Sequence, residues 1–511
     1  MSKNNIGFRE SILDKNTFTV TWELIPGRGA VEESQKSLIK MAEAAAAGGK
    51  VSAVTITDNP GGKPALLSSA LAGEINAMGL DSLIHFSCKD RNRNIIQSEL
   101  YSLERTGCNN ILVMTGDYPT EGYVGRPKPV FDIDATQALR MIEAMNKGEQ
   151  IKLGAKNLTL KPTNLFAGAV VSPFKNTEAE LITQYYKLER KIRNGAKFIY
   201  TQLGYNPAKF AELREYMTLK NLNVPLVGNI FVLSAFVAGL MNKNKVPGCI
   251  VSDGMVKALN EEKDKYGNSK EMSLLRAAKL YAVLKGLKYD GVNISGHGIK
   301  YPELEYILEK GEELYANWQE HAMDLQSYNN YGFHYFQQTT FDQEPLTPVD
   351  TTETGERKFS VPYNIFKAIH FLYFAKKGPM FGLMKAMVLA AHGTFFEKML
   401  TGLEYWIKMR TNDCSKCGDC ALSDLAYLCP MSQCPKQQRN GPCGGSYNGW
   451  CEVYPNVKKC IYVRAYSRLK SDGRQSSLEN KYIKPCNWDL YETSSWFSYF
   501  SGKDYNANPD E

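Results

Sequence analysis

The sequence lacks a strongly apolar N-terminal stretch and any long uninterrupted hydrophobic run. Its first residues, MSKNNIGFRESILDKN, are polar and contain no hydrophobic core of a signal peptide. The most apolar stretch, GPMFGLMKAMVLAAHGTFF, is interrupted by Lys385 and His392, so we expect a buried helix there rather than a membrane span. These features predict a cytoplasmic protein with no membrane span.

Blocks of basic charge are also missing. The 61 Lys and Arg residues and 54 Asp and Glu residues give a net charge of only +7 over 511 residues, and the basic residues are spread out. This pattern does not indicate nucleic-acid binding, although it could favour an acidic partner or a polyanionic substrate. The length predicts two or three domains.

Cysteine is scarce in the first 400 residues and concentrated after them. Cys88, Cys108 and Cys249 are scattered, whereas the other nine of the 12 cysteines lie between Cys414 and Cys486. In a large cytoplasmic chain, such clustering argues for metal ligands rather than disulfides.

Between residue 17 and about residue 300, short β-branched runs alternate with amphipathic stretches. FTVTWELI precedes EESQKSLIKMAEAAAA, VSAVTIT precedes ALLSSALAGEINAM, and YDGVNIS closes the series as the eighth strand. Eight strand–helix units predict an α/β fold with a (β/α)8 TIM barrel, and a doubly wound open sheet is the main rival. Residues 120–160 carry extra material that we expect to form elaborated loops.

The rest of the chain divides into two parts. We predict a barrel domain over residues 1–310, a connecting segment and linker over 311–362, and a small cysteine-rich, metal-binding α+β domain with a C-terminal tail over 363–511. The polar, Pro/Thr-rich stretch DQEPLTPVDTTETGERK indicates the linker. Residues 363–410 are predicted to form two helices, and the tail from residue 471 could wrap over another part of the chain.

Several predicted strands end in chemically useful residues, where a barrel carries its functional groups. WELIPGRG places Glu23 in an apolar strand, where desolvation would raise its pKa and suit a general acid. An ion pair between Glu23 and a barrel Lys or Arg is an equally weighted alternative. HFSCKDRN brings together His85, Cys88 and Asp90, either as a metal site or as a packed Cys beside a hydrogen-bonded His.

Two further strand ends carry polar groups. In MTGDYP, Gly116 lets the backbone approach a ligand and Asp117 adds a carboxylate at the rim, although a simple turn is the plainer reading. In YTQLGYN, Gln202 could pair with the edge of a heterocycle through its donor and acceptor, or it could bond only nearby backbone.

Taken in order, these motifs resemble the methylenetetrahydrofolate reductase family of flavin-dependent barrel enzymes. WELIPGRG, HFSCKD, TGD and LERKIRNGAKFIYTQLGYN are similar to family segments, and the resemblance covers roughly residues 15–300. It implies reduction of 5,10-methylenetetrahydrofolate to 5-methyltetrahydrofolate, or the reverse reaction. The folate would be the substrate and a flavin the cofactor.

The resemblance also implies residue roles. Glu23 would be the general acid that protonates the folate, Asp117 would lie near the flavin ring and help to position the folate, and Gln202 would hold the pterin. The residues implied to line the flavin site are Thr57, His85, Thr115, Gly116, Asp117, Arg190 and Lys191.

The chain departs from the family pattern at three positions. Thr115 replaces an Arg, and Gln184 and Lys187 stand where some members have Asp and Asn. These changes leave FMN and FAD equally plausible. No separate dinucleotide fingerprint is visible, which puts a nicotinamide donor in doubt.

The cysteine-rich stretch has the spacing of a metal centre. Cys414, Cys417 and Cys420 form C-x2-C-x2-C, which can wrap one corner of a [4Fe–4S] cluster. The further candidate ligands are Cys429, Cys434, Cys443, Cys451 and Cys460. Eight thiolates could hold two clusters, one cluster with zinc in place of the other, or two structural zinc ions.

This stretch resembles the MetV-type accessory subunit of bacterial methylenetetrahydrofolate reductases, here fused to a MetF-type barrel. The motifs are CSKCGDC, LCPMSQCPK, NGPCGG, CEVYP and CIYVRAYSRLK, within about residues 363–470. The resemblance implies an iron–sulfur module that passes electrons to the flavin from ferredoxin or another donor protein. Cys486 is either a stray thiol or a replacement ligand.

Two alternatives stay open. The module could hold structural zinc in an NAD(P)H-dependent reductase, or the chain could be a non-catalytic electron-transfer component of a C1-pathway complex. The sequence leaves the oligomeric state undecided between a monomer, a homo-oligomer and such a complex.

Overall fold

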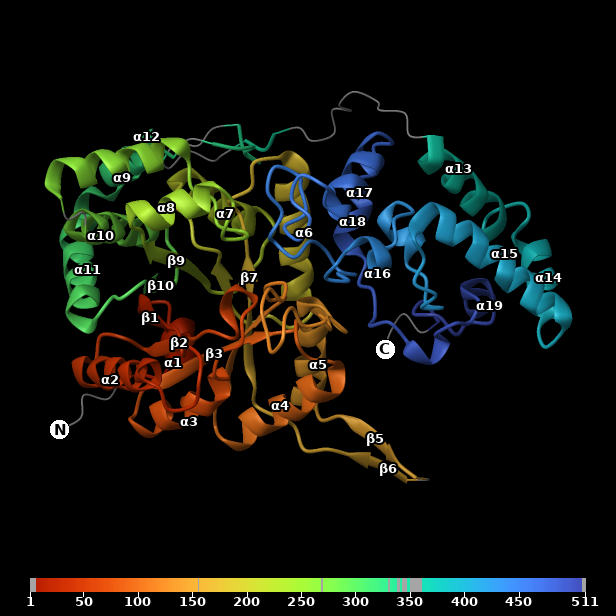
Figure 1. Ribbon diagram of the computed structural model, residues 1–511, viewed down its shortest axis with the longest axis horizontal. Coiled ribbons are helices and arrows are strands. Elements are labelled where there is room, and N and C mark those ends of the chain that lie inside the picture. The colour runs from red at the N-terminus through yellow and green to blue at the C-terminus, as the bar shows by residue number, and fades with distance from the viewer. Residues whose placement is uncertain are drawn as a thin grey trace.

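A closed barrel of eight parallel strands forms the first part of the chain (Figure 1). The computed structural model describes residues 6–154, 156–267, 270–329, 331–337, 341, 347–349 and 361–507. The strands follow the order β1-β10-β9-β8-β7-β4-β3-β2 around the barrel, which confirms the predicted (β/α)8 barrel over an open sheet. Their bounds are β1 Thr19–Leu24, β2 Ala53–Ile56, β3 Asp81–Ser87, β4 Asn110–Met114, β7 Phe166–Val171, β8 Ile199–Thr201, β9 Leu226–Val232 and β10 Gly291–Gly296.

Helices surround this barrel on the outside, and α1 closes its amino-terminal end (Figure 1). Phe8 and Ile12 of α1 pack against inward-facing apolar side chains such as Phe166 and Tyr200. The helices are α1 Phe8–Leu13, α2 Glu33–Gly48, α3 Ser68–Ala77, α4 Arg93–Arg105, α5 Ala135–Lys147, α6 Glu178–Arg193, α7 Pro207–Leu219, α8 Ala235–Asn242, α9 Asp253–Tyr266, α10 Lys270–Gly286, α11 Tyr301–Leu314 and α12 Trp318–Ser327, with short 3-10 turns η1 Pro60–Gly62 and η2 Tyr315–Asn317.

Part of the barrel interior is polar. The Thr21 hydroxyl donates to Asn293 Oδ1 at 2.9 Å, and the Thr55 hydroxyl donates to the same oxygen at 3.3 Å. Asn293 Nδ2 donates to Asn229 Oδ1 at 3.3 Å. Apolar side chains fill the amino-terminal end of the barrel. We therefore expect a ligand site at the opposite, carboxyl end of the strands.

The extra material after β4 differs from the expectation. The strands β5 Gln150–Leu153 and β6 Lys156–Thr159 pair antiparallel where a loop was expected, and they project from the barrel (Figure 1). The alternation that would reveal these strands spans only four residues on each side, too few to separate from a polar loop.

Helices and loops make up the cysteine-rich part. Its elements are α13 Val361–Ile369, the π-helical turn η3 His370–Phe374, α14 Phe381–Ala391, α15 Phe395–Asn412, η4 Leu422–Leu425, α16 Pro430–Gln433, α17 Ile461–Lys470, α18 Ser477–Asn480, η5 Trp488–Leu490 and α19 Ser495–Phe500. Over the described residues 361–507 we find isolated β-bridges but no strand, so the predicted α+β arrangement is wrong for this part. The predicted boundary at residue 310 falls inside α11. Of the predicted linker stretch, the structure describes residues 347–349, where Pro348 forms an isolated β-bridge with Phe336.

The expectations for residues 363–410 need two corrections. Three α-helices and a π-helical turn replace the two predicted helices. The apolar stretch around α14 is helical but not buried, since Leu383 is 63% exposed and Phe395 is 77% exposed. Within the described residues, no helix is both long enough and apolar enough to cross a bilayer.

The C-terminal tail returns to the barrel, as predicted. Arg93 donates to the Cys486 carbonyl at 2.8 Å, and Gln137 donates to the Ile483 carbonyl at 2.9 Å. The indole N–H of Trp488 donates to Asp132 at 2.9 Å. The tail therefore ties the cysteine-rich part to the barrel surface at α4 and α5.

Candidate active site and cysteine module

Glu23 lies near the carboxyl end of β1, between the buried side chains of Trp22 and Leu24. Burial raises the pKa of its carboxyl group to about 7. Among the described residues, no Lys or Arg forms an ion pair with it and no group donates a hydrogen bond to it. The alternative of a structural ion pair is therefore wrong, and the carboxyl group can hold a proton near neutral pH.

Two other predicted site residues lie in the same neighbourhood. Burial, and after it the charges of Asp117 and Glu23, raises the pKa of the Cys249 thiol to about 12, so both carboxylates lie within electrostatic range of this thiol. A Cβ atom added to the adjacent Gly248 would lie 3.4 Å from Gln202 Nε2. The fold thus brings Glu23, Asp117 and Gln202 around one segment, although they come from three different strands.

Asp117 and Gln202 each have one local bond. Asp117 Oδ2 accepts from the backbone N–H of Gly61 at 2.8 Å. Gln202 Oε1 accepts from the backbone N–H of Leu203 at 2.9 Å, a bond to nearby backbone of the kind that one alternative predicted. No acceptor for Gln202 Nε2 is found among the described residues, so its amide donors remain available to a ligand.

Buried polar atoms without a partner occur just after β2 and β7, inside β3 and on α6. Within the described residues, Thr57 Oγ1 and His85 Nε2 make no hydrogen bond, nor do Ser172 Oγ and Gln184 Nε2. Burial also lowers the pKa of His85 to about 4, so its imidazole is neutral near pH 7. A buried polar group without a partner is costly, so this set fits a bound molecule rich in hydrogen-bonding groups.

The other partners considered for His85 do not converge on a metal position. Asp90 pairs with Lys89 and accepts from Asn59 at 3.1 Å, and the Cys88 thiol is buried with its pKa raised to about 12. No group of three or more His, Cys, Asp or Glu that could hold a metal ion occurs in the described part of the chain.

Thr115 and Gly116, at the end of β4, contact the cysteine-rich part directly. The Thr115 hydroxyl donates to Gln438 Oε1 at 3.1 Å, and the Gly116 carbonyl accepts from Lys436 Nζ at 2.8 Å. Gly116 has φ +87°, and a Cβ atom there would lie 2.8 Å from the Ser87 Cβ, so only glycine fits. Lys436 also forms a buried ion pair with Glu452.

Two buried lysines of the barrel hold the NGPCGG loop. Lys175 Nζ donates to the Ser446 carbonyl at 2.7 Å and to the Gly444 carbonyl at 2.5 Å. Lys187 Nζ donates to the Gly441 carbonyl at 3.0 Å and to Gln438 Oε1 at 2.9 Å. The loop that carries Cys443 is therefore fixed against the carboxyl end of the barrel.

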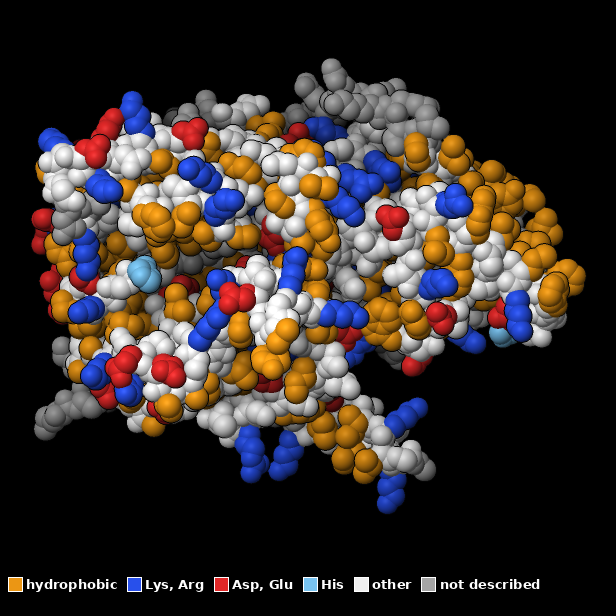
Figure 2. Space-filling model, viewed as in Figure 1, with side chains coloured by type: hydrophobic (Ala, Val, Ile, Leu, Met, Phe, Trp, Pro, Cys, Tyr) orange, Lys and Arg blue, Asp and Glu red, His pale blue; other side chains and the backbone are white. Residues whose placement is uncertain are grey.

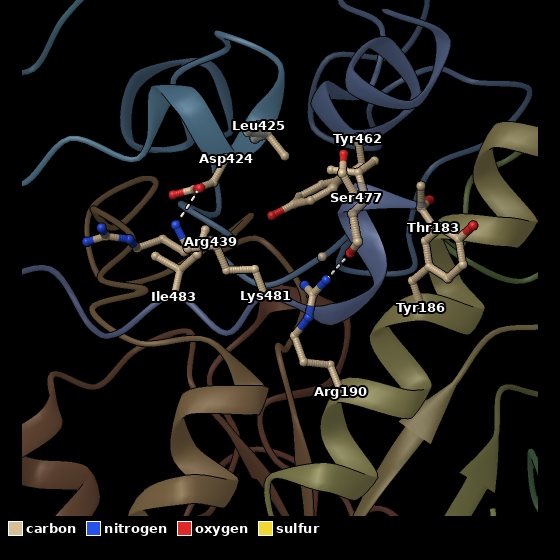
Figure 3. A pocket seen from close by; sticks show the side chains of 12 residues that line it. Thr183, Tyr186, Arg190, Asp424, Leu425, Arg439, Tyr462, Ser477, Lys481 and Ile483 are labelled. Carbon is tan, nitrogen blue, oxygen red and sulfur yellow. Dashed lines mark hydrogen bonds and ion pairs between the residues drawn. The ribbon is translucent and has the colours of Figure 1, made fainter. Parts of the chain in front are cut away.

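Arg190 and Lys191, predicted at the flavin, point in different directions. Arg190 donates to the Leu478 carbonyl and lines a cavity with about 370 Å³ of empty space between α6 and the cysteine-rich part (Figure 3). Lys191 Nζ donates to the Val170 carbonyl of β7 at 2.5 Å, and burial lowers its pKa to about 7. The basic pair does not form one phosphate site in this arrangement.

Eight cysteines line two separate pockets, four in each. The first set comprises Cys414, Cys417, Cys420 and Cys429, around about 420 Å³ of empty space. The second set comprises Cys434, Cys443, Cys451 and Cys460, around about 410 Å³. Neither set closes on a single-ion position in the described residues. All eight predicted ligands are thus grouped, and Cys486 lies beside Cys417 without lining the first pocket.

Sequence reasoning missed the residues that join the two parts. Lys175, Lys436 and Gln438 gave no signal, because a lone Lys or Gln in a loop has no spacing that reveals its partner. Lys187 and Gln184 were noted only as departures from a family pattern. Both residues lie at the interface with the cysteine-rich part, where Lys187 bonds to Gln438. This contact is a physical reason for the departure at residue 187.

Two families match the two parts of the chain. Residues 9–288 match the family described as methylenetetrahydrofolate reductase. The chain belongs to the methylenetetrahydrofolate reductase family. Residues 394–489 match a family described as methylene-tetrahydrofolate reductase C terminal, so both parts of this family member are related to reductase sequences.

Individual relatives are more distant. Methylenetetrahydrofolate reductase 2 of Saccharomyces cerevisiae is 24% identical over 189 residues, or 37% of this chain, and the chain spans about 30% of the length of that relative. A Clostridium thermocellum protein, described as uncharacterized and binding two copies of 5-methyl-5,6,7,8-tetrahydrofolic acid, matches 60% of this chain and 99% of its own. Its TM-score is 0.42 at 13% identity, too low to inform function.

Proposed function

We propose that this chain interconverts 5,10-methylenetetrahydrofolate and 5-methyltetrahydrofolate, using a flavin at the barrel mouth and electrons that enter through the cysteine module. The observation that carries the proposal is Glu23, an unpaired carboxyl group with a pKa of about 7 at the end of β1. Asp117 and Gln202 lie around the same segment as Glu23. Reducing the methylene group takes up two electrons and two protons, and Glu23 is placed to supply a proton.

The unsatisfied polar atoms fit a flavin. Thr57 and His85 on one side, and Ser172 and Gln184 on the other, offer donors and acceptors to a polar ring system. When bound, a flavin accepts single electrons and delivers a hydride, which links iron–sulfur chemistry to folate reduction. Thr115 and Lys187, two of the departures from the family pattern, are bonded to Gln438 of the module, and the flavin proposed here is FMN or FAD.

The two cysteine sets support two [4Fe–4S] clusters. A zinc ion holds its thiolates at about 2.3 Å and needs them close together, whereas a cubane spreads four thiolates over a larger volume. Each set supplies the four thiols that one cluster needs, and the C-x2-C-x2-C spacing in the first set is typical of a cluster. The second set shares Lys436 and Gln438 with the barrel interface, so it would be the cluster nearer the flavin.

An anaerobic turnover assay tests this function. Protein purified without oxygen should form 5-methyltetrahydrofolate from the methylene compound with reduced viologen as donor, and heat should release a flavin whose mass identifies it as FMN or FAD. Turnover with NADH alone, from protein that contains zinc and no iron, would favour the alternative of a zinc-stabilised NAD(P)H-dependent reductase. Absence of flavin and of turnover would favour a non-catalytic component.

A further inference from the structure

An unusual apolar surface lies at the end of the molecule away from the barrel (Figure 2). We call residues 361–412, which comprise α13, the π-helical turn, α14 and α15, the helical arm. Among the described residues of the arm, those that are buried are Tyr363, Val388, Ala391, Glu404 and Asn412. Thirteen large hydrophobic side chains of the arm are exposed, namely Ile365, Ile369, Phe371, Leu372, Leu383, Met387, Leu389, Phe395, Phe396, Met399, Leu403, Trp406 and Met409. Such a concentration marks an interaction surface.

A large apolar pocket opens beside the arm. Its empty space is about 1350 Å³, and it lies between the arm, η4 and α19. Six Phe, Tyr and Trp side chains line it together with aliphatic ones, and the six include Phe374, Tyr427, Trp496 and Tyr499. A pocket with aromatic side chains that adjoins an exposed apolar surface suits the anchoring side chains of a partner.

The pocket and the first cysteine set share a wall. Cys420, Lys408, Leu422 and Ser495 line both the apolar pocket and the pocket of the first set. Lys408 Nζ lies 3.5 Å from Cys420 Sγ and 2.7 Å from Glu404 Oε1. A protein seated on the arm would therefore lie next to this set.

The charge of the arm limits what can cover it. The arm contains seven basic residues and two acidic ones, Glu397 and Glu404. Glu404 is buried and paired with Lys408, and Glu397 accepts from the Gly393 N–H at 2.6 Å. Within the described residues, five basic side chains of the arm form no ion pair, namely Lys376, Lys377, Lys385, Lys398 and Arg410. A second copy of the chain would bring like charges together, whereas an acidic partner would be attracted.

We infer that the helical arm is the docking surface for an acidic electron-carrier protein of the ferredoxin class, which delivers electrons to the first cysteine set at Cys420. This inference rests on the proposed iron–sulfur function of the module. Each reduced carrier loses one electron and the cluster gains it. Two such transfers, with one proton from Glu23, which solvent then reprotonates, and one from solvent directly, match the reduction of one methylene group to a methyl group.

Binding of a purified two-cluster [4Fe–4S] ferredoxin tests the surface. The double variant Phe396→Glu/Trp406→Glu places two carboxylates at side chains that are 59% and 62% exposed, so folding should be unaffected. Its dissociation constant for ferredoxin, measured by calorimetry, should rise at least tenfold. The matched control is Leu153→Glu on the β5–β6 hairpin, 68% exposed, which should bind like the wild type.

Electron transfer gives an independent readout. In stopped-flow experiments, reduction of the wild type by ferredoxin should slow at least tenfold in the double variant, while reduction by dithionite proceeds at the wild-type rate. Calorimetric binding does not require a cluster, so a zinc-loaded module would defeat the proposed function without hiding the docking result.

Three outcomes would overturn the docking inference. One is that ferredoxin binds the wild type and the double variant equally well, or binds neither of them. Another is a wild-type dimer that the double variant converts to a monomer, which would assign the arm to a second copy. The third is co-sedimentation with phosphatidylglycerol vesicles that the double variant loses, with ferredoxin affinity unaltered, which would assign it to a membrane surface.

Discussion

At the scale of single residues, the catalytic proposal depends on the proton held by Glu23. The substitution Glu23→Gln keeps the shape of the side chain but removes the acidic proton. Folate reduction should fall by about 10² to 10⁴-fold, the usual contribution of a positioned general acid. Flavin content and flavin reduction by viologen should match the wild type, because no step before the folate needs this proton. Folate turnover at the wild-type rate in Glu23→Gln would remove Glu23 from the mechanism.

The pH dependence follows from the same group. Its pKa in the folded chain is about 7, above the ordinary value of 4.5, so the acid form is present below pH 7 and is lost above it. The rate of folate reduction should therefore be level below pH 7 and fall about tenfold for each unit above it. A profile without a break near pH 7 would contradict the assignment.

Stability provides a check on this pKa that is independent of activity. Because the folded pKa is the higher one, the folded chain binds more protons, and its stability falls as the pH rises from 4.5 to 7. Above pH 7, the ionisation of Glu23 should lower the free energy of unfolding by up to about 3 kcal/mol. Glu23→Gln should therefore melt higher than the wild type at pH 8, and the two should melt alike at pH 4.

Site residues could be predicted from the sequence where they lie at or near the end of a predicted strand. Glu23, Asp117 and Gln202 follow apolar runs, and barrel geometry alone brings strand ends together. Arg190 was predicted from a motif, and the structure directs it to the Leu478 carbonyl instead. This partner is 288 residues away in sequence, and no local pattern contains that information. The role of Arg190 at the flavin stays a prediction.

At the scale of elements, the interface between barrel and module depends on a buried ion pair. Lys436 and Glu452 are each at most 6% exposed, and Lys436 also reaches the Gly116 carbonyl. Lys436→Met leaves Glu452 buried without its partner and should lower the free energy of unfolding by about 3–5 kcal/mol. Adding Glu452→Leu should recover much of this loss. The control Lys36→Met breaks an exposed pair with Glu33 and should cost less than about 1 kcal/mol.

The two cysteine sets should also be separable. Cys420→Ser should remove about four iron atoms per chain and leave the second set loaded, and Cys443→Ser should do the reverse. Cys108→Ser, a buried thiol of the barrel core, should leave the iron content unchanged. Loss of all iron in either variant, or an equal loss in the control, would contradict two independent sites.

The helices illustrate where element prediction failed. Alternation of strands and helices in residues 17–300 was regular, so the eight-stranded barrel could be predicted. In the helical arm, the apolar content of GPMFGLMKAMVLAAHGTFF predicted burial, yet Leu383 and Phe395 are largely exposed. Hydrophobicity indicates that a surface needs covering, but not whether the same chain covers it.

At the scale of the whole molecule, the proposed electron path runs from the helical arm through the two cysteine sets to the barrel. The helical arm adjoins the first cysteine set, and the second set adjoins the carboxyl ends of the strands through Lys436 and Gln438. Spacing predicted eight candidate ligands but could not divide them into two sets. The division depends on how the loops fold around the barrel rim, which tertiary contacts decide.

The most direct test of this account is metal analysis with electron paramagnetic resonance on anaerobically purified protein, before and after reduction. The account predicts about eight iron atoms and one flavin per chain, and cluster signals that appear on reduction and disappear when methylenetetrahydrofolate is added. A chain that carries zinc without iron, or clusters whose reduced signals persist in the presence of the folate, would contradict it.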